Sequence, residues 1–294
     1  PEACGKIGIK MKNKKTICLV TAILLLIIGW VIWGNKALMI NEITIKNEKI
    51  PDSFSGFRIA QISDLHNAEF GKDNKKLLSL LETCEPDIIL LTGDLVDSRN
   101  TDIEIAISFS EKAATIAPTY YVSGNHEARI DEYEELIEGL ENAGVQVLKN
   151  ESVLLEQSGE SICVAGMEDP SFVTDYLFGD SEAVTIDVLS ELISDEDIFT
   201  ILLSHRPELF DAYVECKADL VFSGHAHGGQ FRLPFIGGIV APNQGLFPEY
   251  DAGQFTEGST DMIVSRGIGN SILPFRINNR PEIVLVELKS ETLE

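Results

Sequence analysis

The sequence predicts a layered α/β domain that is preceded by one N-terminal transmembrane helix. Three observations indicate this class. Apolar strand-like runs alternate with helical patterns over most of the chain, one charge-free apolar run lies near the N-terminus, and no internal repeat is visible. Of the 294 residues, 44% are hydrophobic, which is enough for a full core. Disordered and fibrous classes are therefore excluded.

The charge-free run extends from Thr16 to Trp33. At 1.5 Å per residue a helix of this length spans roughly 27 Å, close to the thickness of a bilayer core. Four lysines lie within six residues before the run, at 10, 12, 14 and 15, whereas only Lys36 follows it closely, so the positive-inside rule places the N-terminus in the cytoplasm. We therefore predict a basic cytoplasmic N-terminus over 1–15, a single-pass signal anchor in the cell membrane over 16–34, a tether and first strand over 35–50, and an extracytoplasmic domain over 51–294.

A cleaved export signal is the main alternative, because the lysines that follow Met11 and the apolar run are typical of one. No small-x-small cleavage site follows the run, and Trp30 and Trp33 are placed like interfacial anchors. An uncleaved anchor is therefore favoured, and the flanking lysines disfavour a buried core helix. Met11 is also a candidate start residue, because residues 1–10 resemble a tag remnant or an upstream extension.

The net charge excludes one class of partner. The chain has 23 basic and 47 acidic residues, a formal charge of -24. Residues 1–36 hold six lysines and one acid, which leaves 17 basic and 46 acidic residues, a charge of -29, for the rest. A domain this acidic cannot neutralise many phosphates, so nucleic acid is not an expected partner.

The globular part begins with an alternating strand around Ile43 and Ile45. Helices are expected over 72–85, 182–193 and 207–216, and Thr101 with Glu104 forms a capping-box pattern for another. Asp131 is the expected cap of a helix that Gly144 ends. Further strands are expected at the apolar runs 57–63, 87–93, 119–124, 162–167, 199–204, 219–224, 262–265 and 282–288.

Residues 228–260 are rich in Gly and Pro, and we expect a long ordered loop there, at the rim of an active site. Its apolar side chains either line a lipid-facing groove or pack the loop onto the core. These side chains are Phe231, Leu233, Phe235, Ile236, Leu246 and Phe247.

Five strand-like runs end in polar residues, and all five histidines of the chain lie at these ends. A purely structural set of histidines would be scattered over helices and surface. Loops at the carboxyl ends of strands in α/β sheets converge on one crevice, so these residues are expected to meet. The segments are Ser63-Asp64-Leu65-His66, Gly93-Asp94-Leu95-Val96-Asp97, Gly124-Asn125-His126-Glu127, Ser204-His205 and Gly224-His225-Ala226-His227.

Imidazole, carboxylate and amide oxygen suit the borderline metals Mn, Fe, Zn or Co. Seven candidate ligands are enough for two divalent ions, and two ions can activate a water and clamp the oxygens of a displacement at phosphorus. His126 is left over and is suited to protonate the leaving oxygen, and Asp97 can hold its ring by a hydrogen bond. The candidate ligands are Asp64, His66, Asp94, Asn125, His205, His225 and His227.

These motifs resemble those of the calcineurin-like metallophosphoesterase superfamily, in the same order and over positions 57 to about 288: DLH at 64–66, GDLVD at 93–97, GNHE at 124–127, His205, and GHAH at 224–227. The resemblance implies a four-layer αββα sandwich, so the domain over 51–294 is expected to be a metallophosphoesterase domain. It implies that Asp64, His66, Asp94 and His227 hold one ion and that Asp94, Asn125, His205 and His225 hold the other. His126 would be the catalytic acid, oriented by Asp97.

Flanking residues, among them SHRP at 204–207, are similar to the membrane-anchored or exported phosphodiesterase branch of that superfamily. We therefore expect a metal-dependent phosphohydrolase, with a phosphodiesterase favoured, that acts on a lipid-linked or envelope phosphate ester. The alternatives are a phosphomonoesterase with the same site and a non-catalytic metal-binding domain. Asn67, Arg99 and Arg206 are candidate contacts to the substrate; surface or helix-end salt bridges are the alternative for the two arginines.

Overall fold

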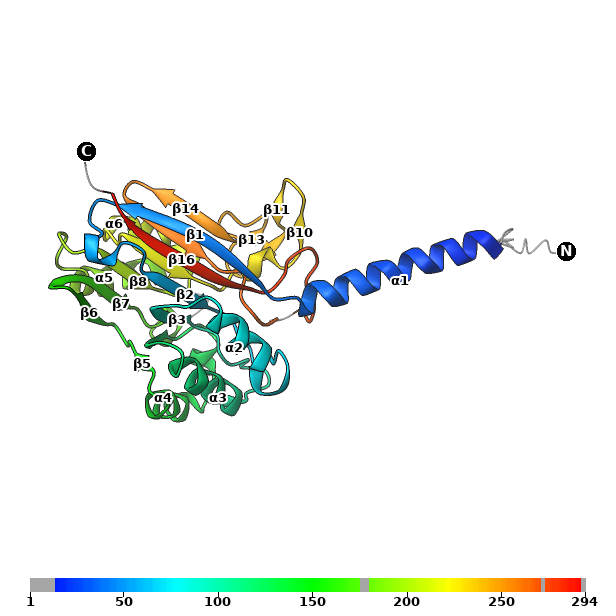
Figure 1. The fold of residues 1–294 in the computed structure, drawn as a ribbon, viewed down its shortest axis with the longest axis horizontal. Coiled ribbons are helices and arrows are strands. Elements are labelled where there is room, and N and C mark those ends of the chain that lie inside the picture. Colours follow the sequence, from blue (N-terminus) through cyan, green and yellow to red (C-terminus); the bar gives the residue numbers. More distant parts are fainter. Residues whose placement is uncertain (1–13, 175–179, 271–272, 292–294) are drawn as a thin grey trace.

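The computed structural model describes residues 14–174, 180–270 and 273–291. Two six-stranded mixed sheets face each other and helices cover both outer faces, which confirms the predicted αββα sandwich (Figure 1). In the first sheet the strands lie in the order β1 (Met39–Asn47), β16 (Glu282–Ser290), β2 (Arg58–Ile62), β3 (Ile88–Thr92), β4 (Thr119–Val122) and β5 (Gln146–Val147). In the second the order is β14 (Gly253–Glu257), β15 (Thr260–Val264), β9 (Leu220–Ser223), β8 (Thr200–Leu203), β7 (Glu160–Gly166) and β6 (Glu151–Gln157).

The central strands are buried on both faces, which explains why they read as continuous apolar runs. In β3, Ile88 and Leu90 pack between the two sheets, whereas Ile89 and Leu91 pack against the helices. Because β2, β3 and β4 are parallel neighbours, as are β7, β8 and β9, their carboxyl ends lie at one edge of each sheet. This edge is where the polar motifs follow the strands.

The helices form the two outer layers. On the first sheet lie α2 (Lys75–Glu82), α3 (Ile103–Ala114) and α4 (Tyr133–Asn142), and on the second lie α5 (Ser181–Leu192) and α6 (Phe210–Glu215). Apolar residues at helical spacing, such as Leu77 and Leu81 of α2, are fully buried against the sheet. The helices therefore hold the strands in place from outside.

Two predicted helix caps are wrong. Helix α3 starts at Ile103 with Asp102 at the N-cap, and neither a capping box at Thr101 nor any side-chain capping bond is formed. Helix α4 starts at Tyr133 after Glu132, so Asp131 does not cap it. Both helices follow loops that carry site residues, and the path of these loops decides where each helix begins.

Two predicted helices are divided. Within 72–85, Lys72–Asn74 form a short 3-10 turn before α2, because Asp73 and Asn74 adopt left-handed backbone angles with φ of 52° and 57°. Likewise Pro207–Leu209 form a 3-10 turn before α6. The Pro at the start of that turn sets its φ but supplies no amide hydrogen.

The expected long loop over 228–260 contains short paired strands, so its description as a loop is only partly right. The pairs are β10 (Arg232–Leu233) with β11 (Gly237–Gly238), and β12 (Val240–Ala241) with β13 (Gly245–Leu246). Strand β14 follows and forms an edge of the second sheet. Strands of two residues show no alternation in a sequence.

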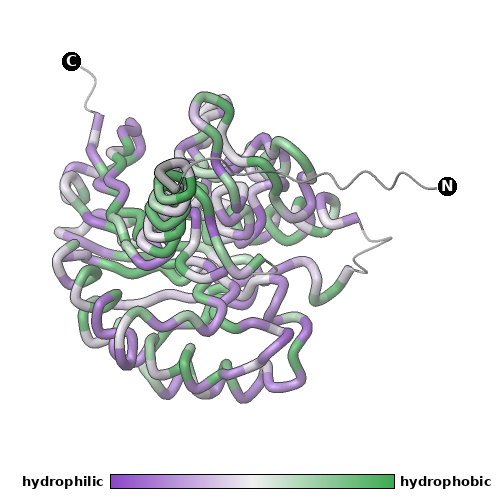
Figure 2. The backbone as a smooth tube through the Cα atoms, turned by 90° about the vertical axis from the view of Figure 1, so that its right-hand side faces the viewer, coloured by the Kyte–Doolittle hydropathy of each residue, from purple (hydrophilic) through white to green (hydrophobic). Residues whose placement is uncertain are grey.

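Helix α1 (Lys14–Lys36) is long and apolar enough to cross a membrane. No other helix in the described part of the chain meets this criterion. It projects away from the domain and appears end-on and hydrophobic in Figure 2. Its C-terminal end is tied to the domain, because the Asn35 side chain donates to the Arg276 carbonyl oxygen at 2.9 Å and accepts from the Arg276 amide at 2.7 Å. Residues 1–13 of the predicted basic N-terminus lie outside the described residues.

Candidate active site

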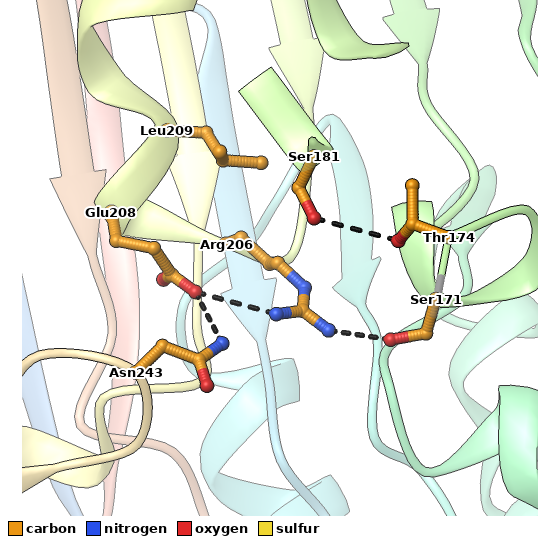
Figure 3. Close-up of a pocket in the computed structure, with 7 residues that line it drawn as sticks. All are labelled: Ser171, Thr174, Ser181, Arg206, Glu208, Leu209 and Asn243. Atoms are coloured by element: carbon orange, nitrogen blue, oxygen red, sulfur yellow. Dashed lines mark hydrogen bonds and ion pairs between the residues drawn. The ribbon is translucent and has the colours of Figure 1, made fainter. Parts of the chain in front are cut away.

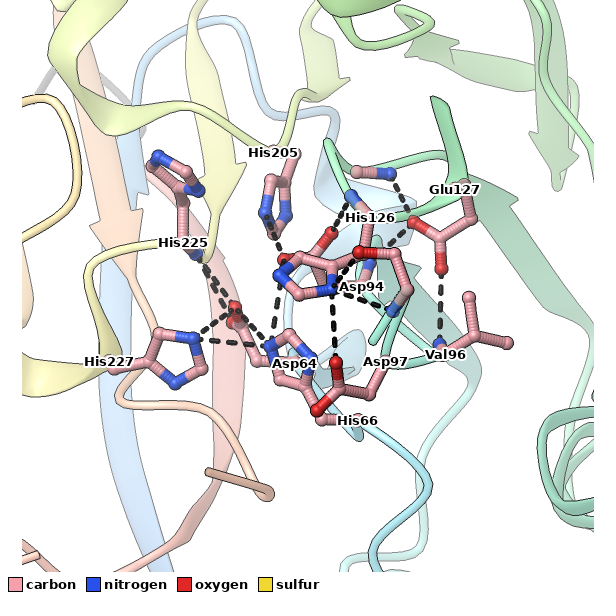
Figure 4. A network of polar contacts seen from close by, with 12 residues as sticks. Asp64, His66, Asp94, Val96, Asp97, His126, Glu127, His205, His225 and His227 are labelled. Carbon is pink, nitrogen blue, oxygen red and sulfur yellow. Dashed lines mark hydrogen bonds and ion pairs between the residues drawn. The ribbon is translucent and has the colours of Figure 1, made fainter. Parts of the chain in front are cut away.

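Loops from both sheets bring the predicted site residues together between the two sheets (Figure 4). Asp64 and His66 follow β2, Asp94 follows β3, and Asn125 and His126 follow β4 in the first sheet. The second sheet contributes His205 after β8, and His225 and His227 after β9. All eight residues are buried, although their side chains are polar. Such burial needs a partner that balances the polar atoms.

Three groups of side chains offer metal-ligand atoms that lie within 4.8 Å of one another. One group is Asp64, His66 and His227, another is Asp94, His205 and His225, and a third joins His66, Asp94 and His126. Asp94 takes part in two groups and lies between them: its Oδ2 is 3.5 Å from His66 Nε2 and 3.2 Å from His205 Nε2. A carboxylate in this position is suited to bridge two ions.

The atoms left without hydrogen bonds fit metal ions. Asn125 Oδ1 is buried and has no hydrogen-bond partner among the described residues. His205 donates from Nδ1 to the carbonyl oxygen of Thr92 at 2.7 Å, so Nε2, which faces Asp94, is the atom that can bind an ion once it loses its proton. The Nε2 atoms of His66 and His227 face each other at 3.2 Å. A cation would satisfy all of these acceptors, and the donor set is one that borderline divalent metals prefer.

The backbone of the site is strained. Five candidate ligands, Asp64, His66, Asp94, His225 and His227, have φ between 45° and 63°, a region that side chains other than Gly seldom adopt. Strain of this kind persists where the surroundings fix it, and it is common at functional sites.

Two glycines allow the loops to approach each other. A Cβ on Gly124 would overlap the Asp94 carboxylate, and one on Gly224 would overlap Ser63 Oγ and the Asp64 carboxylate. Both motifs therefore need Gly directly before the candidate ligands.

Mutual electrostatics hold the two site aspartates ionised. Burial favours the neutral carboxyl of Asp64, but His227 and His66 outweigh it and keep its pKa below the usual range. Burial likewise opposes the charge of Asp94, yet His205 keeps its pKa well below the usual range. In return, the Asp94 carboxylate overcomes burial and raises the pKa of His205 to about 10. Both carboxylates are thus ionised and available as ligands for a cation.

His126 has a different partner from the predicted one. Its Nδ1 accepts a hydrogen bond from the Ser98 amide at 3.0 Å and contacts Ser98 Oγ at 3.1 Å. Asp97 Oδ1 lies 3.6 Å from Nδ1, too far for the expected hydrogen bond, because Arg99 holds the Asp97 carboxylate at 2.9 Å and 2.7 Å. Burial, more than any neighbour, lowers the pKa of His126 to about 4. The neutral ring therefore carries its proton on Nε2, which lies 4.0 Å from Asp94 Oδ2.

Glu127 is a functional residue whose role sequence reasoning missed. Its fully buried carboxylate accepts hydrogen bonds from the amides of Asp94, Leu95, Val96 and Gly124 at 2.7–3.2 Å. It thereby joins the loop after β3 to the loop after β4. An acid directly after the Asn125-His126 pair was visible in the sequence, but its partners are backbone amides, which no sequence motif reveals.

A cavity of about 160 Å³ opens onto the site and is lined by Arg99, His126, Asn243 and other residues. The Arg99 side chain is 44% exposed and reaches this cavity while paired with Asp97. Asn67 lies beside the same loop, where its side chain donates to the Asn100 carbonyl oxygen at 2.7 Å. Arg99 thus borders the opening, whereas Asn67 is not among the residues that line it, and contact of either residue with the substrate remains a prediction.

A second cavity of about 360 Å³ is lined by Ser171, Arg206, Glu208 and Asn243 among others (Figure 3). Arg206 is buried and forms a two-point ion pair with Asp169 at 2.7 Å and 2.9 Å, and it also donates to Ser171 Oγ at 2.6 Å. Arg206 thus forms the salt bridge that was the alternative to substrate contact, although it also borders the cavity. Asn243 lines both cavities, so they adjoin at this residue.

The sequence and the fold are similar to those of known proteins. The sequence model of the family described as calcineurin-like phosphoesterase matches residues 57–229. The chain is 32% identical over 258 residues, 85% of each chain, to the uncharacterized metallophosphoesterase YkuE of Bacillus subtilis. It is 29% identical to the phosphodiesterase YaeI of Escherichia coli, over 81% of this chain and 84% of that protein. The structure of TT1561 of Thermus thermophilus shares the fold, with a TM-score of 0.50 at 17% identity over 73% of this chain and 91% of that one.

Proposed function

The chain belongs to the calcineurin-like phosphoesterase family, and from this membership we propose that it is a membrane-anchored phosphodiesterase acting on a lipid-linked or cell-envelope phosphate ester. Its metal-dependent phosphoesterase character follows from the family and from the buried His and Asp groups. The proposal adds the preference for a diester, the anchor and the class of substrate.

The observation that carries the catalytic proposal is the position of His126 beside a complete set of candidate ligands. His126 lines the opening of the site together with Asp94 and Asn125. A site that only stabilised the fold would have no use for an additional imidazole at its mouth. This arrangement disfavours the alternative of a non-catalytic metal-binding domain.

The chain's own residues have separable tasks in the proposed reaction. Asp64, His66, Asp94 and His227 would hold one ion, and Asp94, Asn125, His205 and His225 the other. When bound, two divalent ions would supply an activated water and neutralise charge on the phosphate. Ser98 holds the His126 ring, and in the proposed reaction the protonated imidazolium of His126 would give its Nε2 proton to the leaving oxygen and return to the neutral ring. Arg99 and Asn67 are proposed to contact the phosphate from the rim.

The second cavity favours a diester over a monoester. A diester carries two organic groups, and the polar cavity beyond Asn243 offers room for the second of them. Its lining of hydroxyl, amide, guanidinium and carboxylate groups suits a hydrophilic substituent. We therefore propose that Arg206 and its neighbours contact this group, with Arg206 held in place by Asp169.

We propose that α1 is an uncleaved, single-pass signal anchor in the cell membrane, with the domain on the extracytoplasmic side. The support is its apolar length and the lysines before it. Among the relatives, a Danio rerio protein that is 27% identical over 84% of this chain is called a transmembrane protein with metallophosphoesterase domain. Protease treatment of intact cells tests the topology: the domain should be digested, and a fully protected domain would reverse the orientation.

The activity is tested by hydrolysis of bis-p-nitrophenyl phosphate and p-nitrophenyl phosphate with Mn²⁺. We expect the diester to be hydrolysed faster, and we expect Asp94→Asn to reduce turnover at least about 100-fold, because a bridging ligand matters more than the outer-shell groups whose loss costs 10–100-fold. The matched control Asp187→Asn, at an exposed position of α5, should be unaffected. Faster turnover of the monoester would favour a phosphomonoesterase, and no metal-dependent turnover of either ester would favour a binding domain.

A further inference from the structure

A cavity of about 270 Å³ lies where the C-terminal end of α1 meets the domain. Trp30 and Trp33 line it from the helix, and Arg266, Arg276 and Arg280 line it from the domain. We call this the arginine pocket. It shares no lining residue with the cavity at the metal-ligand cluster, although Asn279, which also lines the pocket, donates to the His227 carbonyl oxygen at 2.7 Å.

The arginine pocket has an excess of positive charge in an acidic protein. The whole chain has eight arginines, so three of them line one cavity. Arg266 forms an ion pair with Glu282 at 3.4 Å. Among the described residues, neither Arg276 nor Arg280 forms an ion pair with a carboxylate. Three arginines thus line the pocket, and among the described residues one carboxylate lies within ion-pair distance of them, which leaves positive charge that an anion would balance.

The guanidinium groups are held in place by neutral partners. Arg276 is almost fully buried, and it donates to Asn270 Oδ1 and to the carbonyl oxygens of Arg266 and Gly269. Burial lowers its pKa to about 10, so it remains charged at neutral pH.

Arg280 donates to the carbonyl oxygens of Ala37 and Leu38, and its guanidinium lies 5.0 Å from the centre of a Trp33 ring. It thereby ties the junction between α1 and β1 to the pocket. A pocket built in this way loses little entropy when an anion binds.

The surroundings place this pocket at the level of a membrane surface. Trp30 and Trp33 occupy the last turns of α1, where interfacial aromatics are expected. The neighbouring hairpins are attached to the same region, because the Asn278 side chain, which lines the pocket, donates to the Arg232 carbonyl oxygen. In Figure 1 these hairpins lie on the side of the domain that faces α1.

Apolar side chains point outward from the hairpins. Phe235 is fully exposed, and Ile236, Leu246 and Phe247 are at least 60% exposed. Packing of the loop onto the core is therefore excluded for these four residues. Exposed apolar tips beside a cationic pocket are suited to a bilayer surface that carries phosphate groups.

We propose that the arginine pocket binds the phosphate of an anionic phospholipid headgroup and thereby fixes the domain against the membrane. Planar guanidinium groups match phosphate oxygens with two parallel hydrogen bonds. The inference rests on the proposed anchor, since α1 must stay in the bilayer, but it does not depend on catalytic activity.

Fluorescence quenching tests the site, because Trp30 and Trp33 are the only tryptophans of the chain. The full chain is placed in phosphatidylcholine nanodiscs that contain a fixed fraction of either brominated phosphatidylglycerol or brominated phosphatidylcholine. We expect stronger quenching by the anionic lipid. The association constant of phosphatidylglycerol relative to that of phosphatidylcholine should fall about fivefold in Arg266→Gln and in Arg280→Gln. This ratio corresponds to roughly 1 kcal/mol per basic side chain at an anionic surface.

Matched variants separate pocket binding from general attraction and from misfolding. Arg232→Gln makes the same charge change on the adjacent hairpin but outside the pocket, and its quenching should equal that of the wild type. Arg266→Lys and Arg280→Lys keep the charge and should retain part of the preference, while circular dichroism checks the fold. Equal quenching by the two lipids in the wild type, or an equal loss in Arg232→Gln, would overturn the proposal.

Inorganic phosphate distinguishes the two sources of the anion. If millimolar phosphate leaves the preference for phosphatidylglycerol unchanged, the occupant is the lipid headgroup. If phosphate removes the preference, the pocket binds free phosphate and the lipid assignment is overturned. No ester is hydrolysed in this experiment, so its failure is distinguishable from a failure of the proposed phosphodiesterase activity.

Discussion

The backbone amide of His225 donates hydrogen bonds to the carboxylate of Asp64, at 3.1 Å and 3.2 Å from its two oxygens. The two residues are 161 positions apart and belong to different sheets. This contact joins the loops of the two sheets inside the cluster of candidate ligands. The site is therefore assembled only when both sheets are packed against each other.

Gly224→Ala should disturb this contact. The new Cβ would overlap Ser63 Oγ and the Asp64 carboxylate, so the loop that carries His225 must move. Overpacking of this kind typically costs about 1–3 kcal/mol in the free energy of unfolding, and we also expect weaker metal binding. Urea unfolding and metal titration measure the two effects. Gly29→Ala, in open space on α1, is the control, and similar effects of both substitutions would contradict the account.

His126→Gln should slow the reaction in a way that depends on the leaving group. General acid catalysis contributes roughly 10²–10⁴-fold, and a poor leaving group needs the proton most. We therefore expect a large fall in kcat for phenyl esters and a smaller one for p-nitrophenyl esters. Metal content, measured by mass spectrometry, should stay unchanged. An equal loss on both esters would argue against His126 as the acid.

Glu127→Gln should destabilise the protein and weaken metal binding. The amide side chain has one acceptor oxygen in place of two, so some of the four backbone amides lose their partner. A buried unsatisfied donor costs about 1–3 kcal/mol. Chemical denaturation measures this loss, with Glu134→Gln, an exposed residue of α4, as the control. Unchanged stability in Glu127→Gln would show that the loops do not depend on this carboxylate.

The pair of His205 and Asp94 predicts a pH dependence of stability in the metal-free protein. The pKa of His205 is raised to about 10 in the folded state from an ordinary value of 6.5. Its contribution to stability is therefore fully present below pH 6.5 and is lost as the pH rises through about 10. We expect the free energy of unfolding to fall by more than about 1 kcal/mol over this range, since one pKa unit corresponds to about 1.4 kcal/mol.

The check is thermal unfolding of the chelator-treated protein at several pH values, compared with His205→Gln. The difference between the two proteins isolates this one group from other titrating residues. A slope that is the same in both would contradict the assignment. Added metal should reverse the trend, because ligand imidazoles must lose their protons before they bind.

The fold was predictable because its central strands are continuous apolar runs, and the candidate ligands because every histidine follows such a run. Strand β6 was missed, since it lies at a sheet edge and most of its side chains are exposed. The partner of His126 was missed because Ser98 acts through a backbone amide as well as its hydroxyl. The arginine pocket could not be predicted, because Trp33 and Arg280 are distant in sequence and meet only through tertiary packing.

The most direct test of the central claim is recovery of activity in the metal-stripped protein. The full chain is treated with a chelator and titrated with Mn²⁺, while bis-p-nitrophenyl phosphate hydrolysis and bound metal are measured together. The account predicts no turnover without metal and complete recovery of activity when two ions are bound per chain. In Asp94→Asn, both the amount of bound metal and the recovered activity should stay below those of the wild type. Full activity in the metal-free chain, or two ions bound without any hydrolysis, would contradict it.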